Sequence, residues 1–509
     1  MRQALPYRPR FNAPPAAKRP TPALHRLHPG HRQAARLAPA TGSRGQLPRL
    51  AWLAWPVLGA LALALVARAL PAQRTVRPVR GETGFDRALA VATADSAWAR
   101  IAHTYYDTTF HGQDWNAIGR TLHARAARAR DMREVRTAIG EMFAALGESH
   151  FVLIPSDAIA TWADAPVDGE ALGDVGIEFR LLDSTIVVSR VAPDGAAALA
   201  GVHPGWTLTS LGDVDVAAFM RERLDVPRGP ARRLAELQLP MSLMLRTQGS
   251  VGSTMRATFR DGEGRVRRVE AVRRAVPGEV VRFGHLPPQV VRFETQRFSD
   301  DRGCVGVIRF NVWMFPVMAR LDDAMVDFQR CRGIVLDLRG NTGGVTAMLQ
   351  GIGGYFVDTA TSFGTMSTRS GAMQYIATPR RTDRRGAAFV PFGGAVAIVL
   401  DGLSGSTSEM FAAAMQSMGR ARIFGEPSAG QALPAMLARL PNGDVMQHVI
   451  GDFTTADGRR IEARGVTPDV RWPLRRAALL MGRDEAFMDA LAWTGAATVT
   501  TASLSSAAR

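Results

Sequence analysis

The residues best suited to chemistry lie in two short segments, each between an expected strand and an expected helix. The first covers residues 404–409, with the sequence SGSTSE, and follows the apolar run 395–401. A serine on such a turn is exposed at the carboxyl edge of a sheet, where nearby N–H groups and the helix dipole favour a developing oxyanion. The same segment fits a capping box, in which Ser406 only satisfies a helix N–H group. Because caps far outnumber nucleophiles, this segment alone favours the cap.

The second segment covers residues 337–344, with the sequence DLRGNTGG, and it also follows a strand-like run and precedes an expected helix. Its glycines can bring backbone N–H groups close to a substrate carbonyl, because no side chain blocks the approach. This second segment reverses the preference for a cap and favours a nucleophilic serine.

These two segments, with residues 419–426 and 465–470, occur in the order seen in tail-specific, or C-terminal processing, serine peptidases. Residues 290–475 therefore resemble the catalytic core of that family, which implies a crotonase- or ClpP-like α/β fold. The implied site residues are Ser406 as the nucleophile and the N–H groups of Gly344 and Thr407 as the oxyanion hole, with Gly343 as the reserve donor.

The base cannot be the lysine that the tail-specific branch uses. That branch places its lysine in a Gly-Lys-Gly context downstream of the serine, where this chain has Gln431. A carboxamide has no useful basic nitrogen. The only lysine of the chain is Lys18, far upstream of the core. A Ser-Lys dyad is therefore excluded.

The tricorn-like branch of the family instead uses a histidine that follows a serine, with a glutamate near the end of the core. Ser149, His150 and Glu462 match this pattern. The resemblance implies that His150 takes the proton from Ser406, as the near-neutral pKa of an imidazole permits. Ser149 and Glu462 would orient and polarise the site, in an order that the sequence leaves open. Spacing alone favours a structural histidine at a helix end. No group of His, Cys and carboxylate residues has metal-ligand spacing, so no cofactor or metal is expected.

Ahead of this core, the apolar pattern predicts two further domains. Helix-like spacing between residues 85 and 146 predicts a helical N-terminal domain over 83–165. From Gly173 onward the pattern changes to short β-rich runs. Residues 191–206 are similar to the helix-to-strand stretch of a PDZ domain, although Trp206 replaces the usual aspartate.

The resemblance to a PDZ domain covers residues 168–275. It implies that an extended peptide binds as an added strand, with N–H groups near Gly176 and Ile177 holding its terminal carboxylate. The alternative is a degenerate domain that only packs against the peptidase.

In the core, strands and helices alternate, which predicts a largely parallel sheet and an α/β multidomain protein. Residues 345–392 are weakly patterned, and residues 476–509 are expected to form a C-terminal helix and a tail without apolar periodicity. Cys304 and Cys331 each precede a strand-like run. A disulfide and two free buried thiols remain equal alternatives for this pair.

The leader explains most of the basic charge. Residues 1–72 contain eleven Lys and Arg and no Asp or Glu, so the rest of the chain carries 51 − 46 = +5 of the formal +16. Residues 1–50 are expected to be a disordered basic leader, and residues 51–72 a signal peptide or membrane anchor. We therefore expect export to the periplasm or cell envelope and no nucleic-acid partner.

The sequence thus predicts a serine-type endopeptidase or C-terminal processing peptidase that acts on protein or peptide substrates, with the PDZ-like domain recruiting or gating them. The alternative is an inactive family member that binds peptide tails or a hydrophobic small molecule. The presence of Ser406, His150 and Glu462 favours the enzyme. The sequence leaves the oligomeric state open.

Overall fold

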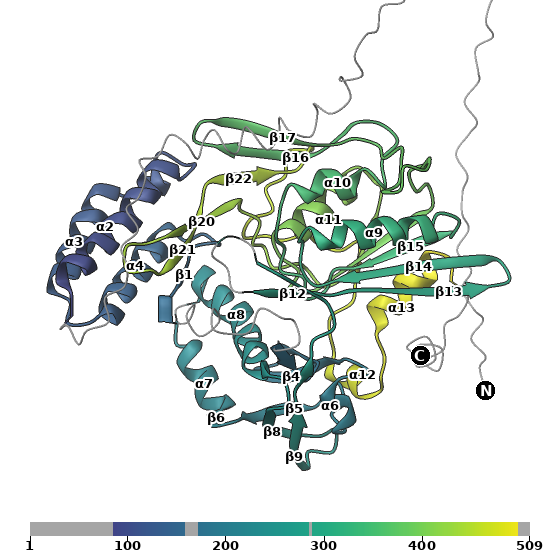
Figure 1. Ribbon diagram of the computed structural model, residues 1–509, viewed down its shortest axis with the longest axis horizontal. Helices are drawn as coiled ribbons and strands as arrows, with labels where there is room; N and C mark the ends of the chain where they lie inside the picture. The colour runs from purple at the N-terminus through teal and green to yellow at the C-terminus, as the bar shows by residue number, and fades with distance from the viewer. Residues whose placement is uncertain (1–84, 158–171, 227, 283, 285–287, 497–509) are drawn as a thin grey trace, which may run out of the picture. The chain divides into compact units, whose positions relative to one another are not determined.

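The computed structural model describes residues 85–157, 172–226, 228–282, 284 and 288–496 (Figure 1). A helical region, an antiparallel β module and an α/β core follow one another in these residues. The predicted leader and apolar segment lie outside the described residues. Within the described part of the chain, no helix is both long and apolar enough to cross a membrane.

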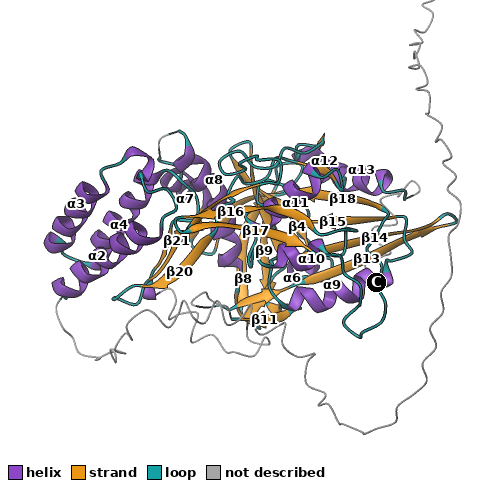
Figure 2. Cartoon of the chain, turned by 90° about the horizontal axis from the view of Figure 1, so that it is seen from above, coloured by secondary structure: helices purple, strands orange, loops and turns teal. Residues whose placement is uncertain are grey.

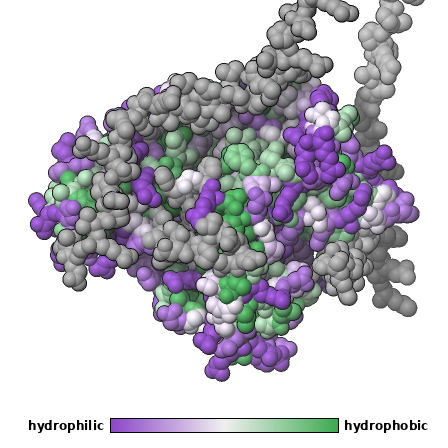
Figure 3. All heavy atoms as spheres, in the orientation of Figure 1, coloured by the Kyte–Doolittle hydropathy of each residue, from purple (hydrophilic) through white to green (hydrophobic). Residues whose placement is uncertain are grey.

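The helical region consists of three helices that lie side by side (Figure 2). Each begins after an aspartate whose carboxylate accepts an N–H from the first turn, and α4 ends at Gly147 in the left-handed conformation (φ 67°). On the face seen in Figure 3, their surface is largely hydrophilic. The elements are α2 (Arg87–Thr104), η1 (Phe110–Gly112), α3 (Trp115–Arg128) and α4 (Met132–Leu146).

A small antiparallel sheet joins the helical region to the core. β1 (Val152–Ile154) pairs antiparallel with β21 (Val445–Val449), which in turn pairs with β20 (Ala435–Arg439). Side chains of β21 complete the hydrophobic cluster of the helices. Arg136 forms a 2.8 Å ion pair with the fully buried Asp444. Strand pairing, hydrophobic packing and an ion pair therefore connect the end of the helical region to the core.

The main sheet of the β module is antiparallel and has the order β3-β4-β5-β8-β9, with β6 added to β5, and β10-β2-β7 form a second antiparallel sheet. β3 lies at the end of this order, and α8 packs beside it. The elements are β2 (Leu172–Asp174), β3 (Ile177–Leu182), β4 (Thr185–Val191), α6 (Ala196–Leu199), β5 (Thr207–Leu211), β6 (Val214–Asp215), α7 (Val216–Arg223), α8 (Pro230–Thr247), β7 (Gly249–Ser250), β8 (Thr254–Arg260), β9 (Val266–Val272) and β10 (Arg274–Ala275).

The core is built on a sheet of order β13-β14-β15-β18-β19-β23, in which only β13 is antiparallel to its neighbour. This confirms the largely parallel sheet predicted from the alternation of strands and helices. The elements are β11 (Glu279–Val281), β12 (Gln289–Val291), β13 (Phe293–Asp300), β14 (Gly303–Phe310), α9 (Pro316–Asp327), β15 (Gly333–Asp337), α10 (Met348–Gly353), β18 (Ala395–Leu400), α11 (Thr407–Ser417), β19 (Arg422–Gly425), β22 (Gly451–Thr454), β23 (Val470–Arg471), α12 (Arg476–Leu480) and α13 (Glu485–Trp493).

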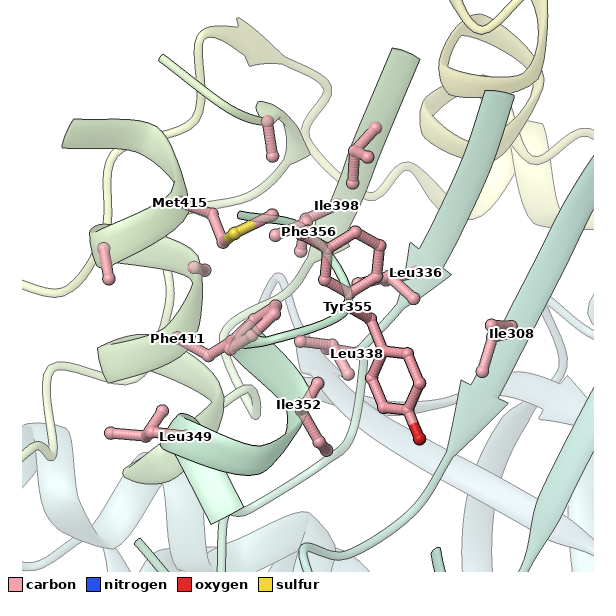
Figure 4. Close-up of a cluster of buried hydrophobic side chains, with 14 of the residues drawn as sticks. Ile308, Leu336, Leu338, Leu349, Ile352, Tyr355, Phe356, Ile398, Phe411 and Met415 are labelled. Atoms are coloured by element: carbon pink, nitrogen blue, oxygen red, sulfur yellow. The ribbon is translucent and has the colours of Figure 1, made fainter. Parts of the chain in front are cut away.

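Helices cover both faces of this sheet (Figure 2). Ile398 of β18 and Leu336 of β15 pack with Phe411 of α11 on one face (Figure 4), and Val399 packs with Phe487 of α13 on the other. Successive strand residues thus point into two hydrophobic clusters, as expected for a parallel sheet buried on both sides. The two layers fix the carboxyl ends of β15 and β18, where the two predicted chemical segments begin.

The weakly patterned region contains a hairpin of β16 (Thr361–Thr368) and β17 (Gly371–Ala377), which pairs with β22. The helix expected from about residue 344 begins only at Met348. The preceding loop is held by a short bridge between Trp313 and Gly344. This bridge keeps the backbone out of the helical conformation.

Cys304 and Cys331 form a disulfide. Cys304 is the second residue of β14 and Cys331 lies two residues before the neighbouring parallel strand β15, and their Cα atoms are 4.6 Å apart. Of the two alternatives that the sequence left open, the structure has the bridge. It lies at the amino end of these strands, the opposite end from the segments 337–344 and 404–409.

Candidate active site

Ser406 occupies a sharp turn between β18 and α11. Its φ and ψ are 54° and −120°, a conformation that side chains rarely adopt. Its N–H donates to the carbonyl of Gln431 at 2.7 Å and to Glu409 Oε2 at 3.0 Å. Ser406 is partly exposed, whereas Thr407, next to it, is buried. A strained, partly exposed serine at the start of a helix is a geometry suited to a nucleophile.

The glycine loop after β15 packs directly on this turn. A side chain at Gly343 (φ 99°) would lie 2.5 Å from Ser406 Cβ, and one at Gly344 (φ 145°) would lie 2.3 Å from the carbonyl oxygen of Trp313. Only glycine fits at either position. The Thr407 hydroxyl donates to the carbonyl of Gly344 at 3.0 Å, which ties the loop to the first turn of α11.

The two glycine N–H groups differ in their surroundings. The N–H of Gly343 donates to Asn341 Oδ1 at 3.0 Å, and Asn341 is fully buried. This donor is therefore already satisfied inside the protein. The geometry leaves Gly344 and Thr407 better suited than Gly343 to receive an oxyanion.

His150, Ser149 and Glu462 lie together, although the first two come from the turn after α4 and the third from the end of the core. Ser149 Oγ is 2.8 Å from His150 Nδ1. The N–H of Ser149 donates to Glu462 Oε1 at 3.1 Å. The backbone of His150 has a positive φ of 62°. Ser149 therefore lies between the imidazole and the carboxylate, an order that the sequence could not assign.

One loop joins this group to the serine turn. Glu462 Oε2 accepts from the N–H of Ala432 at 2.7 Å, and the neighbouring residue Gln431 accepts from Ser406. The position that holds a lysine in the tail-specific branch thus contributes backbone contacts at the centre of the site. All four predicted catalytic residues, Ser406, His150, Ser149 and Glu462, are linked through this loop.

Glu409 contacts the serine turn more extensively than the sequence indicated. Its buried carboxylate accepts four hydrogen bonds, two on each oxygen. The pattern of the segment had identified Glu409 only as the partner in a capping box. The donors are the Ser428 hydroxyl and the N–H groups of Ser406, Gly430 and Gln431.

Burial dominates the acid–base behaviour of the site. It lowers the pKa of His150 to about 4, below the near-neutral value expected from the sequence. It raises the pKa of Glu409 to about 7, although the four donated hydrogen bonds oppose the rise. Burial also raises the pKa of Glu462. His150 is therefore neutral at pH 7, the form in which an imidazole can accept a proton.

Gly176 and Ile177 lie apart from these residues, at the turn from β2 to β3. The N–H groups of Val175 and Gly176 donate to Asp174 Oδ1 at 2.6 and 3.1 Å. The side chain of Ile177 is buried in the core of the β module. The donors expected near Gly176 are thus already bonded to a carboxylate of the chain itself.

Two family models match the chain in the regions that carry these groups. The model described as peptidase family S41 matches residues 304–472, and the model described as the tricorn protease C1 domain matches residues 95–144. The chain is a serine peptidase of family S41.

The relatives of this S41 peptidase are distant. The chain is 24% identical over 379 residues to the carboxyl-terminal-processing protease of Picosynechococcus sp., covering 73% of this chain and 81% of that protein. It is 24% identical over 343 residues to the carboxy-terminal-processing protease of Bartonella bacilliformis, covering 67% and 70%. A solved structure, the photosystem II D1 C-terminal processing protease, shares the fold with a TM-score of 0.52 and 19% identity, over 79% of this chain and 98% of that one.

Within the described residues, no group of three or more His, Cys, Asp or Glu side chains is arranged to hold a metal ion.

Proposed function

We propose that this peptidase cleaves peptide bonds in protein substrates through an acyl-enzyme on Ser406. His150 takes the proton of the Ser406 hydroxyl as its oxygen attacks the scissile carbonyl carbon. The protonated His150 then gives this proton to the leaving amine as the peptide C–N bond breaks. A water molecule, deprotonated by His150, hydrolyses the resulting ester and restores the serine.

The negative charge that develops on the carbonyl oxygen is stabilised by the N–H groups of Gly344 and Thr407. The position of Thr407 in the first turn of α11 adds the positive end of the helix dipole. Ser149 and Glu462 hold the imidazole in one orientation and stabilise its protonated form.

The single observation that carries this proposal is the unbroken set of contacts from His150 through Ser149 and Glu462 to the loop that holds Ser406. These residues are far apart in the sequence. A structural histidine or a simple helix cap would not require these residues and Ser406 to hydrogen-bond to the same loop at Gln431 and Ala432.

The test is labelling of the full-length chain with an alkyl fluorophosphonate, which reacts with activated serines. Ser406→Ala and His150→Ala should both abolish labelling. Ser417→Ala, at the other end of α11, is the matched control and should label like the parent. A folded parent that does not label would instead support an inactive family member that binds tails or a small molecule.

We further propose that residues 168–275 form a PDZ-like domain that assists recognition of substrate tails, and that residues 290–475 have a crotonase- or ClpP-like core. The antiparallel sheet, with β3 at its edge and α8 beside it, supports the first assignment. The names of the relatives agree with a role in processing carboxyl termini. Binding of a free-acid peptide and of the same peptide with an amidated end, measured by calorimetry, tests whether the terminal carboxylate matters.

We also propose that the protein works outside the cytoplasm, in the periplasm or cell envelope. The disulfide between Cys304 and Cys331 supports this location, because such bridges persist in oxidising compartments. Fractionation of cells and assay of the bridge in each fraction would test the proposal. A reduced protein found only in the cytoplasm would contradict it.

A further inference from the structure

A buried carboxylate, Glu148, lies two residues before His150 and contacts both the helical region and the core. Its side chain is only 6% exposed. Four side chains reach it, and with Glu148 itself we call them the Glu148 cluster. Its members are Glu148, Tyr105, Tyr106, His111 and Arg460.

The helical region supplies three of these contacts. Tyr105 Oη donates to Glu148 Oε2 at 2.5 Å, and Tyr106 Oη donates to Oε1 at 2.6 Å. The pKa of both phenols is raised, first by burial and then by the Glu148 carboxylate, so both keep their protons and remain donors at neutral pH. His111 Nε2 lies 3.2 Å from Oε1. A carboxylate with this many donors is fixed in position.

The core supplies the fourth contact through a forked guanidinium. Arg460 Nη2 donates to Glu148 Oε1 at 2.8 Å, and its Nε lies 2.9 and 2.8 Å from the two oxygens of Asp452 on β22. One arginine thus joins the turn that carries His150 to a strand of the core. A lysine has a single ammonium group and cannot reproduce both ends of this fork.

The Glu148–Arg460 contact lies beside a second contact between the same two segments. One residue after Glu148, the N–H of Ser149 donates to Glu462, which is two residues after Arg460. Segments 148–150 and 460–462 are therefore connected at two adjacent points. The first point carries an ion pair, and the second carries the groups proposed to act on Ser406.

We propose that Glu148 and Arg460 are positioning residues that fix Ser149 and His150 against Glu462. This inference rests on the proposed function of that site. Neither residue touches the reacting atoms. Without their contact, the turn is held by fewer bonds and the imidazole moves relative to Ser406. A displacement of about 1 Å in a catalytic group costs about a hundredfold in rate.

The test measures saturation kinetics of an alkyl fluorophosphonate with the full-length chain, which separates the reaction rate constant kinact from the affinity KI. Glu148→Gln and Arg460→Gln should each lower kinact by about 10- to 100-fold and change KI by less than about twofold. Because the two residues act through one contact, the double variant should be no slower than the slower single variant. Arg460→Lys should recover only part of the loss.

The matched control is Arg125→Gln, which breaks an exposed ion pair with Glu141 inside the helical region. It should leave kinact within about twofold of the parent. Thermal unfolding of every variant shows whether the protein remains folded at the assay temperature.

Two results would overturn the positioning role. The first is an unchanged kinact in folded Glu148→Gln and Arg460→Gln. The second is losses that multiply in the double variant, because independent effects do not come from one shared contact. A parent that does not react at all would overturn both this inference and the proposed function, so the two failures can be told apart.

Discussion

Partial burial of the His150 imidazole disfavours its charged form and lowers its pKa. The folded pKa is about 4, against an ordinary value of 6.5. The unfolded chain therefore binds this proton more tightly than the folded one. It follows that the contribution of His150 to the free energy of unfolding is full above pH 6.5 and is lost as the pH falls through 6.5 toward 4.

We predict that the His150 ring stays neutral well below pH 6.5. An NMR titration of the histidine ring protons, with His150 assigned from its absence in His150→Ala, should show an inflection near 4. The rate of fluorophosphonate labelling should likewise persist below pH 6.5. An inflection of the His150 signal between about pH 6 and 7, the ordinary range of an imidazole, would contradict the prediction.

The Glu409 carboxylate links the serine turn to the loop 428–431 through four hydrogen bonds. A glutamine at this position has one oxygen for the four donors, so at least two buried donors would face an amide NH₂ group. We predict that Glu409→Gln lowers the free energy of unfolding by about 2 to 4 kcal/mol in urea at pH 7. Glu270→Gln, in an exposed pair with Arg256, is the control and should change stability by less than about 0.5 kcal/mol.

The sign of the Glu409 titration is opposite to that of His150. Its folded pKa of about 7 lies above the ordinary 4.5, so the folded chain holds the proton more tightly. The stability that Glu409 contributes is therefore full below pH 4.5 and is lost as the pH rises through about 7. A glutamine variant that remained as stable as the parent across this range would show that the four bonds matter little.

At the scale of secondary structure, the disulfide and the active site occupy opposite ends of the same strands. The bridge between Cys304 and Cys331 closes a loop with a sequence separation of 27 residues. We predict that Cys304→Ala with Cys331→Ala lowers the free energy of unfolding by about 3 kcal/mol. Labelling of Ser406 at room temperature should persist, because β14 and β15 keep their pairing. Labelling lost in a folded double variant would show that the amino ends of these strands affect the site.

At the turn between β2 and β3, the Asp174 side chain occupies the N–H groups that a peptide carboxylate would use. Asp174 already accepts from the N–H groups of Val175 and Gly176. A peptide carboxylate arriving there would meet a second negative charge. We predict that Asp174→Asn tightens binding of a free-acid peptide by about tenfold and leaves its amidated form unchanged, measured by calorimetry. Equal affinities in parent and variant would remove Asp174 from recognition.

The elements of the core could be predicted more closely than the loops that carry the chemistry. The apolar run at residues 395–401 forms β18 over Ala395–Leu400, and the helix expected after it is α11, which begins at Thr407. Their apolar pattern is local and strong. The late start of α10 depends on the bridge between Trp313 and Gly344, which is a contact between distant segments and leaves no local pattern.

At the scale of the whole molecule, an arginine of the β module contacts carboxylates of the core that lie beside the site. Arg180 of β3 pairs with Asp401 at 2.5 Å and with Glu426 at 2.8 Å. Asp401 also accepts from the N–H groups of Gly340 and Leu403 at 3.0 Å each. The Asp401 carboxylate thus hydrogen-bonds to the loop after β15 and to the loop after β18. It also forms an ion pair with Arg180 of the β module.

We predict that Arg180→Gln lowers the free energy of unfolding by about 3 to 5 kcal/mol, because it leaves two carboxylates without their buried partner. Urea denaturation measures this loss. Arg256→Gln, an exposed arginine of the same module, should change stability by less than about 1 kcal/mol. Equal losses in the two variants would mean that the contact between module and core contributes little.

The candidate residues Ser406, His150, Ser149 and Glu462 could be proposed from ordered motifs, since each carries a recognisable neighbour. The contacts that hold them could not. Glu148 and Arg460 meet only in the folded chain, and neither has a sequence signal that separates it from an ordinary surface charge. Their pairing depends on helices, strands and loops that are placed by packing across the whole protein.

The wide separation of the site's residues along the chain affects when the protein becomes reactive during its synthesis. His150 leaves the ribosome long before Ser406, and Glu462 emerges later still. The strand β1, beside His150, also waits for β21 as its partner. A partly made chain therefore first contains His150 without Ser406, and later contains both residues without Glu462. A chain that ends before Glu462 therefore cannot complete the proposed site.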